Sequence, residues 1–324
     1  MQRLHLMLVM LLVASAGALG TANAQSYPSR PVRIIVPFGP GGPPDVIARL
    51  VAQKLSERWG HQVYVENIPG AGGNIGYLRT INAPPDGYTL VSTSPGFTVN
   101  PSLYVKSPFD PLRDFSLITL VAGSPNVLAV HPSVPAKTLA ELIALVQQNP
   151  GKYSYAHPSN GTIPHLLGEL LKLRAGLDLV AVPFNGAGAA VMSTLGGHTP
   201  IVIAAVPGVS AAIKAGQLRA LAVTTDRRIL ALPDVPTMKE SGLDDMEGET
   251  LSGIVGPAGL PPEIVQKIHE DITWILQQPE TRERLSQLGF DAIGLGPQQF
   301  RVRVVAEVEK WAKVIVAAKI PKIE

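Results

Sequence analysis

The sequence has 324 residues and no cysteine, and its formal net charge at pH 7 is only +2. The missing thiol excludes disulfide bridges, thiolate metal sites and a cysteine nucleophile. The near balance of charge, without a basic cluster, excludes the electrostatic footprint of a nucleic-acid binder. A chain of this length can bury the cores of two domains of ordinary size.

The beginning of the sequence has the composition of a cleaved export signal. Arg3 forms a short basic region, residues 6–13 form an apolar core too short to span a bilayer, and Ala22-Asn23-Ala24 fits a peptidase site. A buried or membrane-anchoring helix is the alternative, but the small residues before Ala24 favour cleavage. We therefore expect a signal peptide over residues 1–24, a mature chain from Gln25 and a periplasmic location.

Short apolar runs alternate with helical patterns along the first part of the mature chain. Residues 32–36 predict a strand, and apolar side chains between 46 and 55 then recur at helical spacing. Strands at 63–65 and 88–92 follow, next to glycine and proline turns. This alternation predicts an α/β fold with largely parallel strands.

The same alternation restarts near residue 126 and runs to the end of the chain. The further predicted strands are 127–130, 154–156, 179–182, 201–204, 218–223 and 253–255. The further predicted helices are 139–148, 164–173, 262–277 and 297–318. Two α/β units without a flexible linker predict two lobes around a central cleft. We expect residues 25–124 plus 250–324 to form one lobe and residues 125–249 to form the other.

The loop after the first predicted strand has the composition of an anion site. Gly39, Gly41 and Gly42 let backbone N–H groups approach a ligand, and the following helix adds partial positive charge at its N-terminus. This pattern favours a carboxylate, since no Gly-Lys-Ser/Thr ending makes the loop a Walker motif for phosphate. Asp45 either shapes the ligand site or only favours the helix dipole.

Two further loops supply neutral polar groups after predicted strands. Residues 92–96 and 159–162 offer hydroxyls, an amide and free N–H groups, either as a binding wall or as turns and helix caps. The glycine-rich residues 69–76 fail the dinucleotide fingerprint because position 75 is Ile, and a plain strand-to-helix connection accounts for them. We therefore expect no cofactor.

Catalytic patterns are weak in this sequence. The turn around Ser159 resembles a nucleophile elbow, but His157 stands where the first glycine of that strained turn belongs. His165 and Glu169 share a predicted helical face, yet the two-histidine spacing of a zinc protease helix is missing. We expect no catalytic residues and no metal site. The enzyme hypothesis that remains is a secreted serine hydrolase using Ser159 or Ser94 with one of these histidines.

Short motifs occur in a specific order along almost the whole mature chain. They are Tyr27-Pro28, Pro37-Phe38, Gly41-Gly42, Glu66-Asn67, residues 69–76, residues 85–90, Asn100-Pro101, residues 108–111, residues 160–162, His165-Leu166, residues 182–184, residues 195–197, residues 232–238 and residues 256–259. Each motif alone is weak, but the ordered set is specific. In this set the chain resembles the Bug family, the periplasmic binding components of tripartite tricarboxylate transporters.

The resemblance implies a two-lobed Venus-flytrap fold of the periplasmic-binding-protein type, with a carboxylate ligand held in the central cleft. It implies neither catalytic residues nor a cofactor. Carried over by position, it nominates ligand-binding residues in both lobes: Phe38, Gly41, Gly42, Asp45, Ser94, Ser159, Asn160, Gly161, Thr162 and Asn185. It also implies inner-membrane permease subunits as partners, and a monomer is the simpler expectation for a clamp.

Three places depart from the family pattern and bear on the ligand. Pro44 replaces a common Thr and removes a hydroxyl and an N–H donor. His157-Pro158-Ser159 replaces a common Ser-Ser-Gly, and Asn185 stands where Lys is frequent. The ligand of a relative therefore does not transfer directly to this chain.

Three functional hypotheses follow from these patterns. The first is an extracytoplasmic protein that captures a small carboxylate and delivers it to a tripartite tricarboxylate-type membrane transporter. The second is the secreted serine hydrolase. The third is a ligand-sensing protein that keeps the fold but signals through a receptor.

Overall fold

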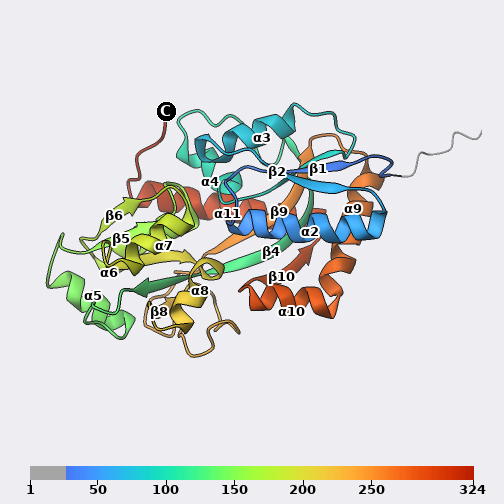
Figure 1. Cartoon of the computed structure of the whole chain (residues 1–324). Coiled ribbons are helices and arrows are strands. Elements are labelled where there is room, and N and C mark those ends of the chain that lie inside the picture. The colour runs from blue at the N-terminus through green and yellow to red at the C-terminus, as the bar shows by residue number, and fades with distance from the viewer. Residues whose placement is uncertain (1–26) are drawn as a thin grey trace, which may run out of the picture.

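The computed structural model describes residues 27–324, so the expected signal peptide at residues 1–24 lies outside the described residues. Figure 1 shows an elongated molecule in which helices cover both faces of one continuous sheet. In the described part of the chain, no helix combines the length and the apolar character needed to cross a membrane. The α/β expectation is confirmed.

The strands form one ten-stranded sheet in the order β2-β1-β3-β9-β4-β7-β5-β6, with β10 and β8 also paired to β4. The strands are β1 (Val32–Val36), β2 (Val63–Asn67), β3 (Thr89–Ser92), β4 (Phe115–Val130), β5 (Ser154–His157), β6 (Val180–Pro183), β7 (Ile201–Ala205), β8 (Arg219–Val223), β9 (Glu249–Pro257) and β10 (Asp291–Leu295). The helices are α2 (Pro43–Trp59), η1 (Ala71–Gly73), α3 (Asn74–Ile81), α4 (Gly96–Leu103), α5 (Leu139–Gln147), α6 (Ile163–Ala175), α7 (Ala187–Leu195), α8 (Val206–Lys214), α9 (Pro262–Gln277), α10 (Pro279–Gln287) and α11 (Pro297–Ala317). Every strand and helix predicted from the sequence is present.

The long strand β4 links two halves of the sheet. Its residues 115–125 pair antiparallel with β9, and β10 pairs along the other edge; we call this part, with β1, β2 and β3, the first half-sheet. Its residues 126–130 pair antiparallel with β7 and β8, which with β5 and β6 make the second half-sheet. Parallel pairs join β1 to β2 and β3, and β5 to β6 and β7. The expectation of largely parallel strands is therefore wrong for the centre of the sheet. Neighbouring antiparallel strands need no crossover helix there.

The strand predicted at residues 127–130 is only the end of β4. Gly123 and Pro125 lie inside this 16-residue strand, although such residues usually mark a break. The pairing with β9 shifts register near Leu117 and again near Leu120, which lets the strand bend. Nearly every residue of β4 is buried, as expected for a strand covered on both faces.

Several short elements escaped the sequence analysis. The helices α4, α7, α8 and α10 have eight or nine residues each, and β10 has five. Helices of two turns show too few repeats of the apolar spacing to stand out. The helix α4 also begins within the segment expected to form a polar wall, and it carries Pro101 in its interior.

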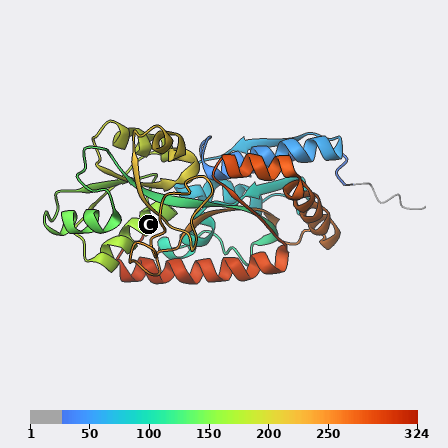
Figure 2. The same cartoon turned by 90° about the horizontal axis from the view of Figure 1, so that it is seen from below.

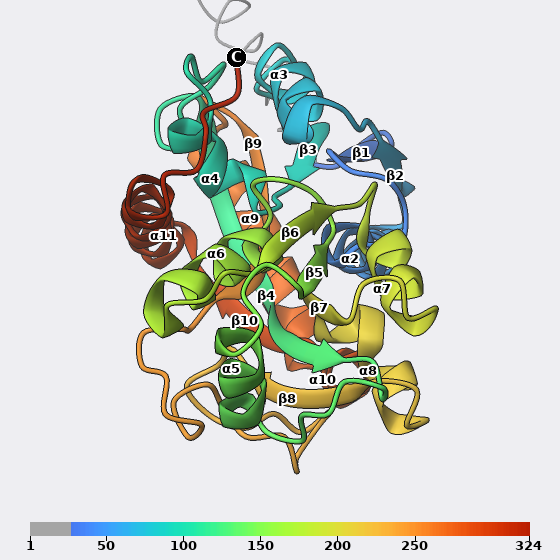
Figure 3. The same cartoon turned by 90° about the vertical axis from the view of Figure 1, so that its left-hand side faces the viewer.

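The helix α11 joins the cores of the two half-sheets. Phe300 and Val304 pack in a buried cluster of the first half-sheet, whereas Trp311 and Ile315 pack in the main cluster of the second. Figure 2 shows this helix running along most of the molecule, and Figure 3 shows it on the side opposite to α2 and α7. Spacings of four, seven and four residues place these side chains on one helical face. Each buried side chain of this size contributes about 1.5–3 kcal/mol, so α11 binds the halves firmly together.

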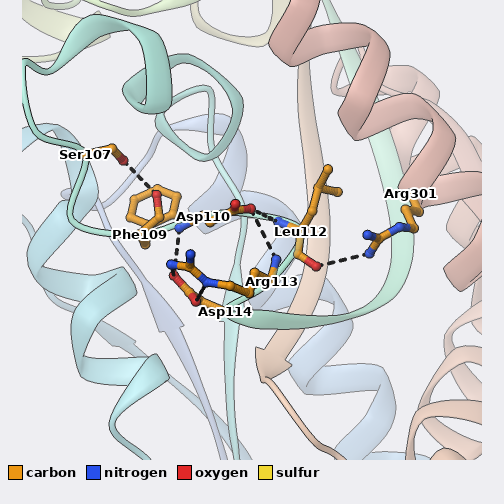
Figure 4. Close-up of polar contacts among 7 residues, drawn as sticks. All are labelled: Ser107, Phe109, Asp110, Leu112, Arg113, Asp114 and Arg301. Atoms are coloured by element: carbon orange, nitrogen blue, oxygen red, sulfur yellow. Dashed lines mark hydrogen bonds and ion pairs between the residues drawn. The ribbon is translucent and has the colours of Figure 1, made fainter.

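A turn between α4 and β4 anchors the start of α11. Leu112 and Arg113 donate backbone N–H bonds to the Asp110 carboxylate at 2.8 and 3.2 Å, and the Asp110 N–H donates to the Asp114 carboxylate at 2.7 Å. Arg301 of α11 donates to the Leu112 carbonyl at 3.1 Å (Figure 4). Asp110 is one of the motif residues of the sequence analysis, and its carboxylate is occupied by this turn.

Candidate ligand-binding site

The candidate site starts at residues 37–45, the first loop, which joins β1 to α2. Gly42 caps α2 in an extended conformation, and Pro43 and Pro44 occupy the first two helical positions, where they have no N–H to donate. The N–H groups of Asp45 and Val46 donate back to the Gly42 carbonyl at 3.0 and 3.1 Å. The end of the helix therefore offers fewer free donors than the sequence implied.

Two backbone donors of the first loop remain available for an anion. The N–H groups of Gly39 and Gly42 have no hydrogen-bond partner among residues 27–324. Gly39 is exposed and Gly42 is half-buried. A Cβ added at Gly39 or Gly41 would meet no atom within 4 Å, so the loop is open on its outer side. Free N–H groups beside a helix N-terminus suit a carboxylate.

Asp45 holds the first loop in shape. Its buried carboxylate accepts the Gly41 N–H at 3.0 Å, Arg49 Nε at 3.0 Å and the Asn67 amide at 2.9 Å. The Asn67 amide also donates to the Phe38 carbonyl at 3.0 Å. Burial alone raises the pKa of Asp45, but the hydrogen bonds from Arg49, Gly41 and Asn67 outweigh it and hold that pKa below its ordinary value. Asp45 is therefore an anionic clamp inside the loop.

The loop after β2 packs against the first loop, and the loop after β3 packs against the loop after β2. A Cβ at Gly73 would lie 3.1 Å from Phe38 Cε2, and a Cβ at Gly96 would lie 2.5 Å from the Gly72 carbonyl oxygen. Glycine at these positions permits the close approach. The ends of β1, β2 and β3 thus form one continuous edge of the first half-sheet, with half-buried Phe38 within it.

Ser94 lies in the same edge, but its polar groups are already paired. Its hydroxyl is 2.8 Å from the Tyr77 hydroxyl, and its N–H donates to that same oxygen at 3.0 Å. Both side chains are buried, and burial raises the pKa of Tyr77 above its ordinary value. In this structure Ser94 anchors the loop before α4.

The second loop, residues 158–162, joins β5 to α6 in the other half-sheet. The Ser159 carbonyl accepts the Thr162 hydroxyl at 2.7 Å and the Thr162 N–H at 3.3 Å. Gly161 has a φ of +78°, and a Cβ there would lie 2.3 Å from Leu103 Cδ2, so the position requires glycine. Asn160 is exposed, and its side chain has no hydrogen bond within the described chain. The loop is thus tightly folded with one free amide on its surface.

The turn after β6 lies beside the second loop. The Phe184 N–H donates to the His157 carbonyl at 3.0 Å, and the Gly186 N–H donates to the Pro158 carbonyl at 2.9 Å. Asn185, between these two residues, is exposed. The structure therefore brings Asn185 next to the second loop.

Two buried histidines lie behind the second loop. The rings of His157 and His165 stack with their centroids 4.6 Å apart. His157 Nδ1 lies 3.1 Å from the Ser159 carbonyl oxygen, and His165 Nδ1 accepts the Gly161 N–H at 3.2 Å. Burial lowers the pKa of each ring to about 4, so both rings are neutral at pH 7. The sequence did not predict that these rings hold the loop. Only the position of His157, directly before the loop in the chain, indicated such a contact.

Neither candidate serine is paired with a base. Ser159 Oγ donates to the Asn160 carbonyl at 3.3 Å, and Ser94 Oγ is bonded to Tyr77. In the described residues, no hydrogen bond joins either hydroxyl to a histidine ring. The contact that activates a serine nucleophile is therefore missing from this arrangement.

A small cavity lies between the two half-sheets beside Ser94. Its volume of about 20 Å³ holds one water-sized group, and its walls include Ile163 of α6 together with Glu249 and Arg303. Arg303 Nη2 lies 3.6 Å from the Glu249 carboxylate. Burial raises the pKa of Glu249 above its ordinary value, and Arg303 only partly opposes this. The sequence analysis missed this charged pair, which lies far from the glycine-rich loops in sequence.

A larger cavity of about 800 Å³ lies elsewhere, within the second half-sheet. It is lined by residues of α5, α8 and β8 and by the segment around Pro236, and it contains none of the nominated residues. The larger cavity is therefore not the one that contains a nominated residue. The small cavity contains Ser94 of the nominated residues and lies between elements of both half-sheets, where an interlobe cleft would lie.

The chain matches a family model described as "Tripartite tricarboxylate transporter family receptor" over residues 47–320. A UPF0065 protein from the tcbD-tcbE intergenic region of Pseudomonas sp. (strain P51) is 36% identical over 308 residues, which cover 94% of this chain and 92% of that protein. BugT of Bordetella pertussis is 35% identical over 305 residues, which cover 94% of each protein.

Solved structures give the same likeness. A protein of R. palustris solved with adipate superposes with a TM-score of 0.87 at 32% identity, over 92% of this chain and 100% of that one. The periplasmic binding protein BugD gives 0.84 at 33% identity over 92% and 100%. MatC of Rhodopseudomonas palustris, with bound malate, gives 0.80 at 29% identity over 89% and 100%. The expected two-lobed periplasmic-binding-protein fold is confirmed by these likenesses.

Proposed function

The chain belongs to the tripartite tricarboxylate transporter receptor family, and we propose that it is an extracytoplasmic solute-binding protein for a small carboxylate. The resemblance to Bug proteins inferred from the sequence motifs is confirmed by BugT and BugD. Neighbours at 32% and 29% identity were solved with adipate and malate, and both ligands are dicarboxylates. A carboxylate is therefore the ligand class that we carry over to this chain.

The observation that carries the proposal is the pair of polar loops at the ends of β1 and β5, one in each half-sheet. The first loop presents the N–H groups of Gly39 and Gly42, and the second presents the amide of Asn160. Neutral donors bind a carboxylate without adding a competing charge. We propose Phe38, Gly41 and Gly42 as ligand contacts in the first loop.

We propose further contacts on the opposite wall and supporting residues behind both walls. Ser159, Asn160, Gly161, Thr162 and Asn185 form the opposite wall. Asp45 and Ser94 support the first wall from behind, because their polar groups are already bonded within the protein.

We further propose that the ligand closes the molecule. Residues 25–124 plus 250–324 form one lobe and residues 125–249 the other, and β4 and β9 cross between them. A ligand that touches both loops has a higher affinity for the closed state than for the open state, so it shifts the equilibrium toward closure. Closure then marks the loaded protein for its partner.

The cellular part of the proposal follows from the family. We propose that the mature chain begins near Gln25, acts in the periplasm as a monomer, and delivers its ligand to inner-membrane permease subunits. We also propose that it catalyses no reaction, in keeping with the serines of the site, whose hydroxyls bond to Tyr77 and to the Asn160 carbonyl and not to a histidine ring in the described residues.

A thermal-shift screen of the purified mature protein tests the ligand class. We expect adipate, malate or a related small mono-, di- or tricarboxylate to raise the melting temperature, because a ligand bound only by the native state stabilises it by mass action. Matched neutral amides of the same acids serve as controls. If every acid leaves the melting temperature of folded protein unchanged, the carboxylate assignment is wrong.

The variants Gly42→Asp and Gly42→Asn test the site. A Cβ at this position meets only Pro44 Cδ, at 3.9 Å, and Asp and Asn are equally good helix caps, so both variants should fold. Like charges about 4 Å apart near a protein surface repel by up to about 4 kcal/mol. We therefore expect Gly42→Asp to weaken carboxylate binding about 100-fold, and at most about 1,000-fold, relative to Gly42→Asn in calorimetric titrations. Equal affinities of the two variants would remove the first loop from the site.

A further inference from the structure

The contacts of His157 and His165 define the protonation of both rings. A carbonyl oxygen only accepts, so the contact of His157 with the Ser159 carbonyl places the proton of that ring on Nδ1. The Gly161 N–H donates to His165 Nδ1, so that nitrogen is bare and the proton is on Nε2. Both rings therefore hold the second loop by hydrogen bonds, but with opposite roles. His157 donates a bond to the loop, and His165 accepts one from it.

One nitrogen of the His157 ring, Nε2, lies where no hydrogen-bond acceptor of the described chain reaches it. This atom is buried and has no hydrogen-bond partner among residues 27–324. The ring itself is fully buried and stacked on His165. A proton added to Nε2 would create a buried charge without an acceptor, which is costly in a dry environment.

The surroundings of the pair supply little charge of their own. Tyr155 on β5 stacks near His157, and its hydroxyl donates to the Glu169 carboxylate at 2.9 Å. Glu169 also pairs with Lys172 of α6 at 2.9 Å, so its charge is already matched. Leu103 of α4 packs against the second loop with an apolar side chain, and the turn after β6 contacts it through the backbone N–H of Gly186, which donates to the Pro158 carbonyl. The Glu169 carboxylate favours a charged His157, but burial of the ring and the neighbouring His165 outweigh it, and Lys172 disfavours a charged His165.

We propose that His157 and His165 are positioning residues that hold the second loop in its observed form only while both rings are neutral. This rests on the proposed function and adds a regulation of the same site. Protonation of His165 on Nδ1 replaces an acceptor by a donor that faces the Gly161 N–H, and the loop loses that bond. Protonation of His157 on Nε2 places a buried positive charge beside the other ring. Acidification therefore releases the second loop before the first loop, whose clamp is a carboxylate.

The ring nitrogens of the unmodified, ligand-free protein provide the first test. Long-range proton–nitrogen spectra of the histidine rings at pH 7 report which nitrogen carries the proton. We expect the proton on Nδ1 in His157 and on Nε2 in His165. The proposal is wrong if His165 carries its proton on Nδ1 at this pH. This measurement needs no variant and no ligand.

The variants His165→Leu and His165→Asn provide the second test. Leucine removes the acceptor of the Gly161 N–H, whereas the Asn oxygen takes nearly the place of Nδ1 and restores it. We expect amide exchange of Gly161 and Thr162, corrected for the intrinsic rate, to be about tenfold faster in His165→Leu and near the original rate in His165→Asn. Equal exchange in both variants, fast or slow, would overturn the positioning role.

His131 offers a matched control in the same half-sheet. Its Nδ1 also accepts a backbone N–H, from Ser133 at 3.3 Å, but the contact is exposed. His131→Leu should therefore leave exchange of Gly161 unchanged. Ring protonation and amide exchange are measured without ligand, so they can fail while the carboxylate screen succeeds, and the reverse is also possible. With adipate as the probe, we also expect His165→Leu to weaken any measured binding about tenfold and His165→Asn to restore it.

Discussion

The two polar loops of the site perform similar tasks with opposite chemistry. The first loop is held by the charged carboxylate of Asp45, whose partner Arg49 is 52% exposed, whereas the second loop is held by two neutral, buried rings. Hydrogen bonds hold the pKa of Asp45 below its ordinary value, so this clamp stays charged in mild acid. The buried rings have a pKa of about 4, so they lose stabilising free energy as the pH falls below about 6.5, the pKa of an unfolded histidine. The two loops of the proposed anion site are therefore weakened by different conditions. Salt acts on the first loop and acid acts on the second.

Gly161→Ala breaks the second loop directly and should have the largest effect. An alanine there takes on an unfavourable φ and forces its Cβ to within 2.3 Å of buried Leu103. We expect a loss of about 3 kcal/mol in the free energy of unfolding, measured by urea denaturation. Gly39→Ala in the first loop is the control, since its Cβ meets nothing, and it should change stability by less than about 0.5 kcal/mol. Similar losses in both variants would contradict the tight fold of the second loop.

Acid should act mainly through the second loop. Unfolded histidines bind protons below about pH 6.5, whereas burial lowers the pKa of the folded His157 and His165 rings to about 4. Stability is therefore complete above pH 6.5 and falls as the pH drops toward 4. For the two rings together, we expect the free energy of unfolding to fall by about 2 kcal/mol between pH 6.5 and 5.5. Asp45 remains ionised over this range in both the folded and the unfolded chain.

Urea denaturation of the wild type and of His165→Asn across this pH range checks the acid effect. The pKa of His269 is also lowered by burial, but it contributes equally to both proteins and cancels. We expect the loss of stability between pH 6.5 and 5.5 to be smaller in His165→Asn than in the wild type by about 1 kcal/mol, the share of one ring. An equal loss in both proteins would show that the acid response arises outside the histidine pair.

Asp45→Asn weakens the clamp of the first loop. The substitution removes the charge that Arg49 and the Gly41 N–H both approach at 3.0 Å. We expect a loss of about 1.5 kcal/mol, because charged hydrogen bonds contribute more than neutral ones but Arg49 is partly screened by solvent. The control is Asp86→Asn, since Asp86 forms a solvent-exposed pair with Arg30. Chemical denaturation of both variants should separate them, and equal losses would mean that Asp45 does not clamp the loop.

Pro44→Thr in the first loop should have the smallest effect on stability. Threonine adds an N–H and a hydroxyl at the second position of α2, where proline has neither. We expect stability to change by less than about 1 kcal/mol and binding of dicarboxylates to tighten by a few-fold. Calorimetric titration with adipate and malate measures the second effect. Weaker binding in the variant would show that the first loop works through its shape rather than through its donors.

The sequence predicted elements well where one local pattern was enough. The helix α9 was predicted with the bounds that the structure has, because Pro262 starts it and its apolar residues keep a helical period. The strand β4 was predicted only at its end, because Gly123 and Pro125 imitate a turn. Tertiary pairing with β9 overrides that local signal.

The sequence predicted the positions of the two candidate loops in the fold but not the residues that hold them in place. Glycine composition located the first loop, yet the bond from Asn67 to Asp45 depends on the pairing of Val36 with Asn67 between β1 and β2. The bond between Tyr77 and Ser94 likewise joins elements that are distant in sequence. Such contacts follow from the register of the sheet, which no short motif encodes.

The course of α11 also determines how the protein comes apart. Phe300 lies in one buried cluster and Trp311 in another, and both belong to α11. If either half-sheet unfolds and releases α11, apolar side chains of the other half-sheet become exposed to water. Separate unfolding of the two halves is therefore unfavourable, and heating should produce one calorimetric transition whose van't Hoff and calorimetric enthalpies agree. A molecule for which we propose closure about its middle is in this way a single cooperative unit toward unfolding.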